Sequence, residues 1–167
     1  MTLATWLTLA ALSWTAPADW DHFQTLSETA HAIAAEVQDP SEAALLMSIA
    51  TTESGGFDPK VDTCEKRGDH GRARSVLQVW PIWDVPGEDV CKDRRAAVRA
   101  AMRAIAWSRR LCGRGPYQLA GYTSGSCGRE PRAGWYLRRA RVWTKGHPFH
   151  PETPALCRAD GCQAVDA

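Results

Sequence analysis

The sequence predicts a mostly helical domain (mostly α) with a small excursion, either a loop or a β-ribbon, between its second and third main helices. Three observations carry this prediction. Apolar residues recur at helical spacing in several segments, capping residues precede those segments, and residues 55–90 lack both features and are rich in glycine, proline and charge. The 167 residues fit one compact domain, and no repeat or low-complexity tract divides them.

The first predicted helix covers "TLSETAHAIAAEVQ", residues 25–38. Thr25 and Glu28 have the spacing of a capping box, in which two side chains satisfy backbone N–H groups at the start of a helix. One apolar face follows at helical spacing. It consists of Leu26, Ala30, Ile33, Ala34 and Val37.

The second predicted helix should lie at the centre of the domain. Asp39 serves as its N-cap, and Pro40 occupies the first helical position. Residues 43–50 are apolar nearly all round, which is typical of a buried helix. The helix should end near Ser54, because the Gly-Gly pair that follows removes the helical preference.

The second half of the chain contains the longest helix candidate, residues 92–113. Its predicted apolar face consists of Val98, Ala101, Met102, Ile105 and Cys112. A short helix should run from Pro116 to Gly125, and a last amphipathic helix should start near Pro131. A short strand or ribbon is predicted over "ARSVLQVW", residues 73–80.

The N-terminal residues 1–18 resemble a secretory signal peptide. They are apolar from Leu3 to Trp14 and end in an Ala-x-Ala pattern, although no Lys or Arg precedes the apolar stretch. An uncleaved weak anchor and a helix buried within the domain are the alternatives. We therefore divide the chain into this segment, a domain at 19–146 and a Pro- and Cys-containing tail at 147–167.

Six cysteines should pair if the chain is exported to an oxidising compartment. The pairs expected are Cys157–Cys162 across a short loop, Cys112–Cys127 and Cys64–Cys91. A zinc site of His147, His150, Cys157 and Cys162 is the alternative. Because its Pro-rich spacing is not a common zinc pattern, we expect neither a metal nor a cofactor.

Charge is distributed unevenly along the chain. Acidic residues outnumber basic ones over 1–91, whereas basic residues dominate 92–145. This asymmetry predicts a basic face that could meet nucleic acid, an anionic polymer or an anionic membrane. A solvated basic helix surface with no partner is the alternative.

Glu53 is the most informative polar residue of the first half. A carboxylate at the C-terminal end of a helix lies at the negative end of the helix dipole, which disfavours its charged form. Apolar neighbours would disfavour that form further, and a carboxyl kept protonated can donate a proton. An ordinary solvated glutamate at a fraying helix end is the alternative on spacing alone.

Three segments in order change that balance. "IATTESGGFDP", "ARSVLQVWP" and "LAGYTSG" resemble the glutamate–serine, Gly-Leu-Met-Gln and Ala-Tyr-Asn-x-Gly motifs of the lytic transglycosylase family with the soluble-transglycosylase, lysozyme-like catalytic domain. The resemblance covers roughly residues 25–145. Ser75, Leu77 and Thr123 depart from the family's usual Gly, Met and Asn.

The resemblance implies an α+β lysozyme-like fold, in which the excursion forms a cleft against the helical body, and a role for each matched residue. Glu53 would be the acid/base that cleaves the β-1,4 bond between N-acetylmuramic acid and N-acetylglucosamine and yields a 1,6-anhydro product. Ser54 would support Glu53 or the substrate, and Thr123 would lie at the substrate. Gln78 and Tyr122 would line the cleft and hold Glu53 or the sugar.

Aromatic residues near the motifs fit a sugar-binding cleft. Trp80, Trp83 and Tyr122 could stack on pyranose rings, whereas Trp107 and Trp135 are expected in the core. His70 receives no role.

Two other functions remain open. A second carboxylate from Asp58, Asp62, Glu65 or Asp69 could activate a water and give a goose-type-like lysozyme, although these four residues could equally be solubilising loop charges. A catalytically silent murein-binding module is the other alternative, because Ser75 and Thr123 depart from the motifs.

The resemblance also implies partners and a location. The substrate would be peptidoglycan glycan strands, reached by an exported (periplasmic or secreted) or a phage-associated monomer with virion or secretion-apparatus partners. Arg138, Arg139 and Arg141 could concentrate the protein at an anionic wall. Nucleic acid competes poorly as a partner, because no recognition motif accompanies the basic helix.

Overall fold

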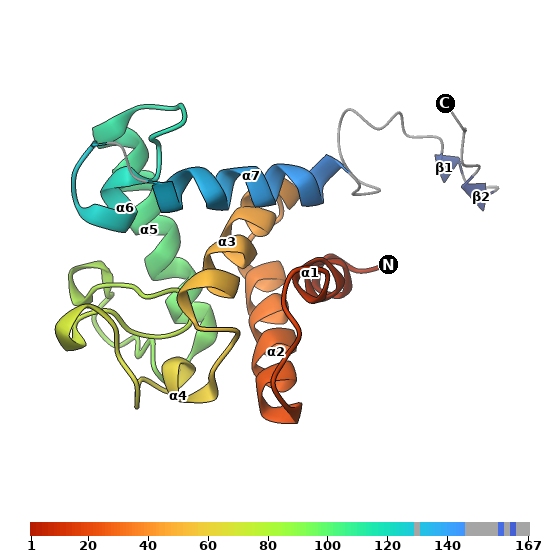
Figure 1. The fold of residues 1–167 in the computed structure, drawn as a ribbon, viewed down its shortest axis with the longest axis horizontal. Coiled ribbons are helices and arrows are strands. Elements are labelled where there is room, and N and C mark those ends of the chain that lie inside the picture. Colours follow the sequence, from red (N-terminus) through yellow and green to blue (C-terminus); the bar gives the residue numbers. More distant parts are fainter. Residues whose placement is uncertain (129–130, 146–156, 159–160, 163–167) are drawn as a thin grey trace.

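The computed structural model describes residues 1–128, 131–145, 157–158 and 161–162, and these are mostly helical, as predicted (Figure 1). The helices are α1 (Leu3–Leu12), α2 (Trp20–Glu36), α3 (Pro40–Glu53), α4 (Pro59–Asp62), α5 (Arg94–Cys112), α6 (Ala120–Ser124) and α7 (Pro131–Lys145), with the 3₁₀ turns η1 (Asp69–Gly71) and η2 (Pro81–Trp83). Two short strands, β1 (Cys157–Arg158) and β2 (Gly161–Cys162), pair antiparallel.

Helix α3 is the centre of the fold, as its sequence predicts. It packs against α1, α2 and α7, and residues 43–51 are all buried. The Asp39 carboxylate accepts hydrogen bonds from the backbone N–H groups of Ser41 at 2.7 Å and Glu42 at 3.3 Å, which is the predicted cap. The helix ends at Glu53 with Ser54 as C-cap, so the predicted end is confirmed.

Helix α2 begins earlier than predicted. Asp19 is its N-cap and accepts a hydrogen bond from the His22 N–H at 3.0 Å. Thr25 is buried within the helix, so the capping box with Glu28 is wrong. The spacing of a capping box recurs inside helices, and the stronger Asp19 cap lies six residues upstream of Thr25.

Helix α1 packs against α2 and α3. Its inward side buries Trp6, Leu7, Ala10 and Ala11 in the same core as the rest of the domain. This packing is the one expected from the alternative in which residues 1–18 form a helix buried within the domain. No helix of the described residues is long and apolar enough to cross a bilayer.

Helices α5 and α6 differ from the prediction in the buried face of α5 and in the first residue of α6. Met102 is 38% exposed and lies at the edge of the buried face of α5, because residues three and four apart share a helix face and Met102 directly follows the buried Ala101. Gly113 ends α5 with a φ of 74°, as predicted. Helix α6 begins at Ala120 rather than at Pro116, and it ends at Gly125 in the left-handed conformation.

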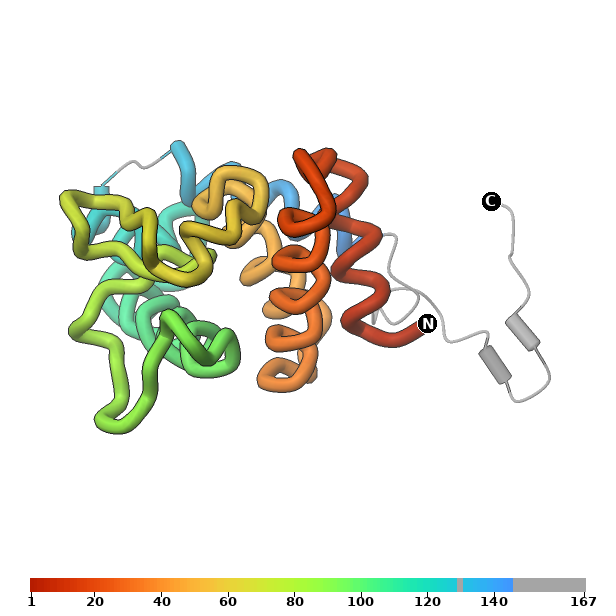
Figure 2. Tube along the Cα trace, turned by 90° about the horizontal axis from the view of Figure 1, so that it is seen from below, coloured from red at the N-terminus to blue at the C-terminus, as the bar shows by residue number. Residues whose placement is uncertain are grey.

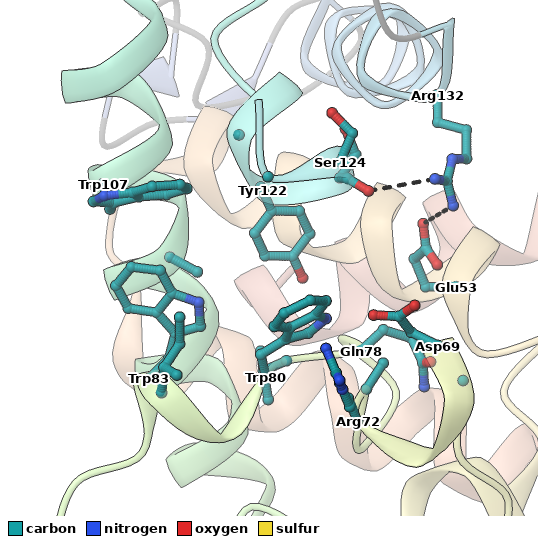
Figure 3. Close-up of a pocket in the computed structure, with 18 of the residues that line it drawn as sticks. Glu53, Asp69, Arg72, Gln78, Trp80, Trp83, Trp107, Tyr122, Ser124 and Arg132 are labelled. Carbon is teal, nitrogen blue, oxygen red and sulfur yellow. Dashed lines mark hydrogen bonds and ion pairs between the residues drawn. The ribbon is translucent and has the colours of Figure 1, made fainter. Parts of the chain in front are cut away.

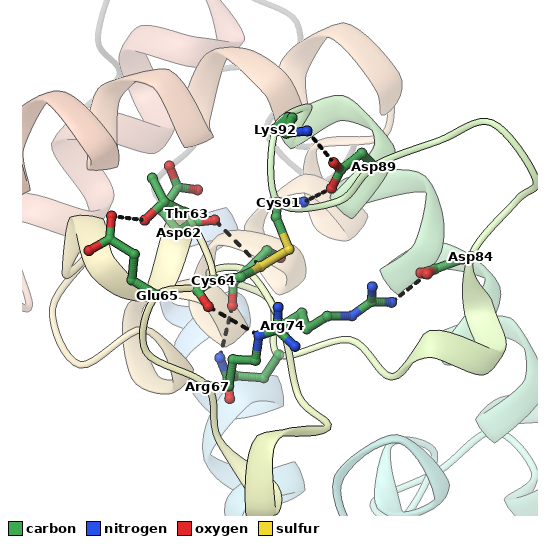
Figure 4. Close-up of a disulfide and its surroundings, with 12 residues drawn as sticks. Asp62, Thr63, Cys64, Glu65, Arg67, Arg74, Asp84, Asp89, Cys91 and Lys92 are labelled. Atoms are coloured by element: carbon green, nitrogen blue, oxygen red, sulfur yellow. Dashed lines mark hydrogen bonds and ion pairs between the residues drawn. A yellow bond between two sulfur atoms is a disulfide. The ribbon is translucent and has the colours of Figure 1, made fainter.

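The excursion, residues 63–93 between α4 and α5, contains no strand. The predicted ribbon is reduced to two isolated bridges, Gly68–Ala73 and Arg74–Val79. The Cys64–Cys91 disulfide closes the excursion at its base, and the Arg74 guanidinium pairs with Asp84 inside it (Figure 4). In both overall views the excursion lies on the side of the molecule away from α1 (Figures 1 and 2).

Two of the three expected disulfides are present, Cys64–Cys91 and Cys112–Cys127. In the tail, β1 and β2 place the backbones of Cys157 and Cys162 opposite each other. The Cys157–Cys162 disulfide and the alternative zinc site with His147 and His150 concern side chains outside the described part of the chain.

The arginines of α5 and α7 differ in their surroundings. On α5, Arg94 pairs with Asp62 at 2.6 Å, and Arg95 pairs with Glu36. Arg99 and Arg109 of the same helix also have carboxylate partners. On α7, the exposed face carries Arg132, Trp135, Arg138, Arg141, Val142 and Lys145.

Two residues of α7, Arg139 and Trp135, differ in their exposure. Arg139 packs inward, with its guanidinium 4.9 Å from the Trp14 ring, and donates to the Thr52 hydroxyl at 2.9 Å. Trp135 is 54% exposed, so its predicted core position is wrong. The buried stripe of α7 instead passes through Ala133, Tyr136, Ala140 and Trp143.

Candidate active site

A cavity of about 970 Å³ lies between the excursion and the helical body (Figure 3). Five parts of the chain contribute to its wall. They are Glu53 at the end of α3, residues 68–83 of the excursion, Ala104 and Trp107 on α5, residues 121–125 at α6, and Arg132 on α7. Its size falls in the range of ligand-binding pockets.

Glu53 reaches the cavity because α3 ends there abruptly. Gly55 and Gly56 have φ values of 65° and 85°, a conformation that glycine adopts without strain. The Glu53 side chain is 19% exposed. The Tyr136 hydroxyl donates a hydrogen bond to its Oε1, and the Arg132 Nη1 lies 3.8 Å from the same oxygen. Helix α7 therefore holds the carboxylate from the side opposite the excursion.

Ser54 shapes the turn after α3 and does not line the cavity. It is fully buried, and its hydroxyl accepts a hydrogen bond from the Phe57 N–H at 2.7 Å. Phe57 has a φ of 67°, which costs energy in a residue other than glycine and has to be held by its surroundings. Of the two predicted roles for Ser54, contact with the substrate does not agree with its full burial outside the cavity, and support of Glu53 stays a prediction.

Gln78 lines the cavity from the excursion. Its Nε2 donates to the Ser75 carbonyl at 2.9 Å, and a Cβ added to Gly68 would lie 2.2 Å from its Oε1. Gly68 therefore leaves the space that the Gln78 side chain occupies. Ser75 stands where the resembled motif has glycine, and its φ of 61° keeps the left-handed backbone that glycine favours.

Tyr122 connects α6 to the excursion. Its hydroxyl donates to the Leu77 carbonyl, and its N–H donates to the Ser108 hydroxyl at 3.1 Å. Burial raises the pKa of Tyr122 well above its usual value, with the nearby Glu53 and Tyr136 adding to the effect, so the phenol stays a donor. Tyr122 and Gln78 both line the cavity, as predicted. Neither forms a hydrogen bond to Glu53, and holding the sugar, the other of their two predicted roles, stays a prediction.

Thr123 lines the cavity beside Arg132. Its hydroxyl donates to the carbonyls of Leu119 at 3.1 Å and Ala120 at 3.2 Å, so the side chain is engaged with its own helix. Its carbonyl accepts a hydrogen bond from the Arg132 Nη2 at 3.3 Å. Thr123 thus helps to hold the guanidinium that lies next to Glu53.

Aromatic rings form much of the remaining wall. Trp80 is 40% exposed, and the Arg72 guanidinium lies 5.6 Å from the centroid of its ring. Trp83 and Trp107 contact each other with centroids 5.4 Å apart. Trp107 was expected in the core, but it faces the cavity, as Figure 3 shows. Flat apolar surfaces of this kind suit the faces of sugar rings.

Only Asp69 of the four candidate second carboxylates lines the cavity with Glu53. Asp58 caps α4 and pairs with Lys66 at 3.3 Å. Asp62 pairs with Arg94. Burial raises the pKa of Asp62, and this effect outweighs the lowering by the Arg94 charge. Glu65 accepts a hydrogen bond from the Thr63 hydroxyl at 3.1 Å.

The sequence does not single out several residues of the site. Among the cavity residues, Asp69 is one of four candidates, His70 has no predicted role, and Arg72 and Arg132 are not predicted. Tyr136, which contacts Glu53 from outside the cavity lining, is not predicted either. A signal for Tyr136 exists, because it falls on the buried stripe of α7 and a buried tyrosine hydroxyl needs a partner. Among the described residues, no group of three or more His, Cys, Asp or Glu side chains could hold a metal ion.

Comparison with protein-family models, curated proteins and solved structures finds no match to this chain.

Proposed function

We propose that this chain is a lytic transglycosylase that cleaves the β-1,4 bond between N-acetylmuramic acid and N-acetylglucosamine in peptidoglycan. The observation that carries the proposal is the position of Glu53. Its carboxylate enters a large cavity from the end of a buried helix and is held there by Tyr136 and Arg132. Aromatic rings line the same cavity, and the three motifs that resemble the family all contribute to its wall.

The reaction needs one carboxyl group. Glu53 gives its proton to the glycosidic oxygen as the bond from that oxygen to the muramic C1 breaks. The muramic C6 hydroxyl then bonds to C1 and returns a proton to Glu53, so that the product carries a 1,6-anhydro ring and the enzyme is regenerated. Tyr136 and Arg132 orient the carboxylate, since each contacts the same oxygen atom.

A second candidate function is hydrolysis, and the location of Asp69 favours it. If Asp69 activates a water on the opposite side of the sugar, the product gains a water and no anhydro ring forms. The Asp58, Asp62 and Glu65 side chains have partners outside the cavity, so this alternative now depends on Asp69 alone.

Mass spectrometry of digested murein tests both functions. Wild-type protein should release muropeptides with anhydro ends, Glu53→Gln should release none, and Asp69→Asn should keep the anhydro products. If wild type instead yields reducing ends and Asp69→Asn abolishes them, the protein is a lysozyme. If Glu53→Gln releases as much product as wild type, the assignment of the acid/base is wrong.

The same variants test a catalytically silent module. A wild-type protein that releases no product but sediments with murein as strongly as Glu53→Gln would be a binding module.

For localisation, we propose an exported or phage-associated protein acting on the wall. The disulfides Cys64–Cys91 and Cys112–Cys127 support an oxidising compartment, where such bonds persist.

A further inference from the structure

We propose that Arg72, stacked on Trp80, is a carboxylate-binding subsite within the cavity and selects glycan strands that carry carboxylate-bearing substituents. This inference rests on the proposed function, because it concerns the substrate of the same cavity. It adds a requirement that the catalytic residues do not impose. The glycan must bring a negative charge to a defined place on the excursion wall.

The first observation is the state of the Arg72 side chain. It lines the cavity, it is exposed, and its guanidinium lies over the Trp80 ring (Figure 3). Among the described residues, no carboxylate lies within ion-pair distance of it. The neighbouring Arg74 pairs with Asp84, and Arg67 donates to the Cys64 carbonyl at 3.1 Å. Arg72 therefore keeps its donors for a ligand.

The second observation is that the guanidinium is fixed in advance. Arg72 follows η1, where Gly71 has a φ of 87°, and the Arg74–Val79 bridge brings Trp80 back alongside it. Stacking on an aromatic ring leaves the edge of a guanidinium free to bind a carboxylate through two parallel hydrogen bonds. A preformed arginine loses less freedom on binding than a solvated one.

The third observation is the distribution of charge around the cavity. Glu53 and its neighbour Arg132 contact each other at one wall, so Arg132 is already engaged at the catalytic carboxylate. Arg72 stands on the excursion wall with Trp80, and Asp69 of the same wall forms no ion pair with it. A ligand carboxylate would therefore be attracted to Arg72 on the excursion wall, which orients an anionic substituent away from the reacting bond at Glu53.

The carboxylates of peptidoglycan come from two sources. The peptide attached to muramic acid carries them in intact strands, and the lactyl group carries one after the peptide is removed. N-acetylglucosamine itself is neutral, so a cavity for bare neutral sugar would give Arg72 no charged partner. The chemistry that Arg72 recognises is the same in both cases.

Kinetics on two preparations of one murein test the subsite. The first is untreated, and in the second the carboxylates are converted to methylamides. Arg72→Gln should raise KM for soluble fragments of untreated murein by about 10-fold, the scale of a hydrogen bond to a charged group, with little change in kcat. On the methylamide form it should match wild type.

Controls separate the subsite from general electrostatics and from damage to the fold. Arg110→Gln removes the same charge from an exposed position on α5 and should change neither KM. Arg72→Lys should lie between wild type and Arg72→Gln, because it keeps the charge without the paired donors. Fragments freed of peptide by an amidase show the source: a persisting Arg72 effect indicates the lactyl carboxylate, and a lost effect indicates the peptide.

The outcomes distinguish the two levels of the proposal. Equal losses for Arg72→Gln on both preparations would mean a structural role, and no loss on either would mean that no subsite exists. Either result overturns the inference while anhydro products still form. Failure of the proposed function itself would appear as an absence of Glu53-dependent products from wild type.

Discussion

At the scale of single residues, the acid/base depends on a contact that spans much of the chain. The Tyr136 hydroxyl reaches Glu53 from a position 83 residues later. Tyr136 is fully buried, so its ring cannot swing away into solvent. Its hydrogen bond and the Arg132 guanidinium fix one carboxylate oxygen, which leaves the other free to face a glycosidic oxygen.

Tyr136→Phe should therefore impair catalysis more than substrate binding. It removes the hydroxyl and keeps the ring, so we expect kcat to fall on the order of 10-fold through loss of orientation, with KM nearly unchanged. The pH–rate profile should shift as well, because a donor to the acid/base is lost. Kinetics across pH would measure both effects.

The matched control is Tyr117→Phe, since Tyr117 is exposed and does not line the cavity. It should behave as wild type throughout. A Tyr136→Phe variant with an unchanged pH profile and a kcat reduced only in proportion to lost folded protein would show that Tyr136 is merely structural.

The sequence alone could predict Glu53 but not what holds it. The end of α3 follows from a local cap and a local Gly-Gly pair, and the ordered motifs identify the carboxylate. Gln78 and Tyr122 are expected to hold Glu53 or the sugar because they belong to those motifs. Their hydrogen bonds go to nearer carbonyls instead, and the true partners lie on α7, whose packing against α3 no local pattern specifies.

At the scale of elements, α1 is part of the hydrophobic core. Leu7 is fully buried, whereas Leu9 on the same helix is 55% exposed. Leu7→Ala should lower the free energy of unfolding by about 2–5 kcal/mol through lost apolar contact and a residual cavity. Leu9→Ala should change it by less than about 0.5 kcal/mol.

Urea denaturation of the full chain would measure this difference. Equal and small effects for Leu7→Ala and Leu9→Ala would mean that α1 does not pack as described. A fall in stability for Leu7→Ala alone would establish that the first helix contributes to the folded domain.

The excursion shows why part of the fold escaped prediction. Cys64, Asp69, His70, Ser75 and Gln78 all have positive φ values, which residues other than glycine rarely adopt. Local propensity therefore argues against the backbone that forms, and a ribbon was the reasonable expectation for "ARSVLQVW". The helices were predictable because their caps and apolar faces agree with their final packing.

The Cys64–Cys91 disulfide should matter for both stability and activity. It closes a loop with a sequence separation of 27, and the loop-closure model gives it about 3–4 kcal/mol. The paired Cys64→Ser, Cys91→Ser variant should lose this stability. It should also lose activity at temperatures where the helices persist, because the enclosed excursion supplies one cavity wall.

Circular dichroism and murein digestion on the same temperature series would check this expectation. The paired Cys112→Ser, Cys127→Ser variant is the comparison, since that bond encloses the α6 wall with Tyr122. Activity that survives until the helices melt in either variant would contradict a stabilising role of that bond at the cavity. Thiol titration of native protein should find the four cysteines protected.

At the scale of the whole molecule, the two disulfides enclose segments that form the cavity wall, and the two long basic helices differ in how much of their charge is exposed. The disulfides bracket residues 64–91 and 112–127, which supply most of the cavity wall. Most arginines of α5 pair with carboxylates from the acidic first half, which neutralises that helix internally. The basic excess of the second half is therefore displayed mainly by α7.

The exposed face of α7 should consequently attract the protein to a polyanionic wall. Arg138 and Arg141 lie on that face beside the exposed Trp135, and none of the ion pairs among the described residues involves them. We expect Arg138→Glu with Arg141→Glu to reduce sedimentation with murein several-fold at low salt. Because such attraction is screened, the difference should shrink as ionic strength rises.

Arg110→Glu with Arg114→Glu is the matched control, because it changes net charge equally at exposed positions outside α7. It should sediment more like wild type, and both double variants should cleave small soluble fragments at the wild-type rate. An equal loss of sedimentation in the two would mean that net charge, and not the α7 face, governs attraction to the wall. A loss of cleavage of soluble fragments in the α7 variant alone would place Arg138 or Arg141 at the substrate instead.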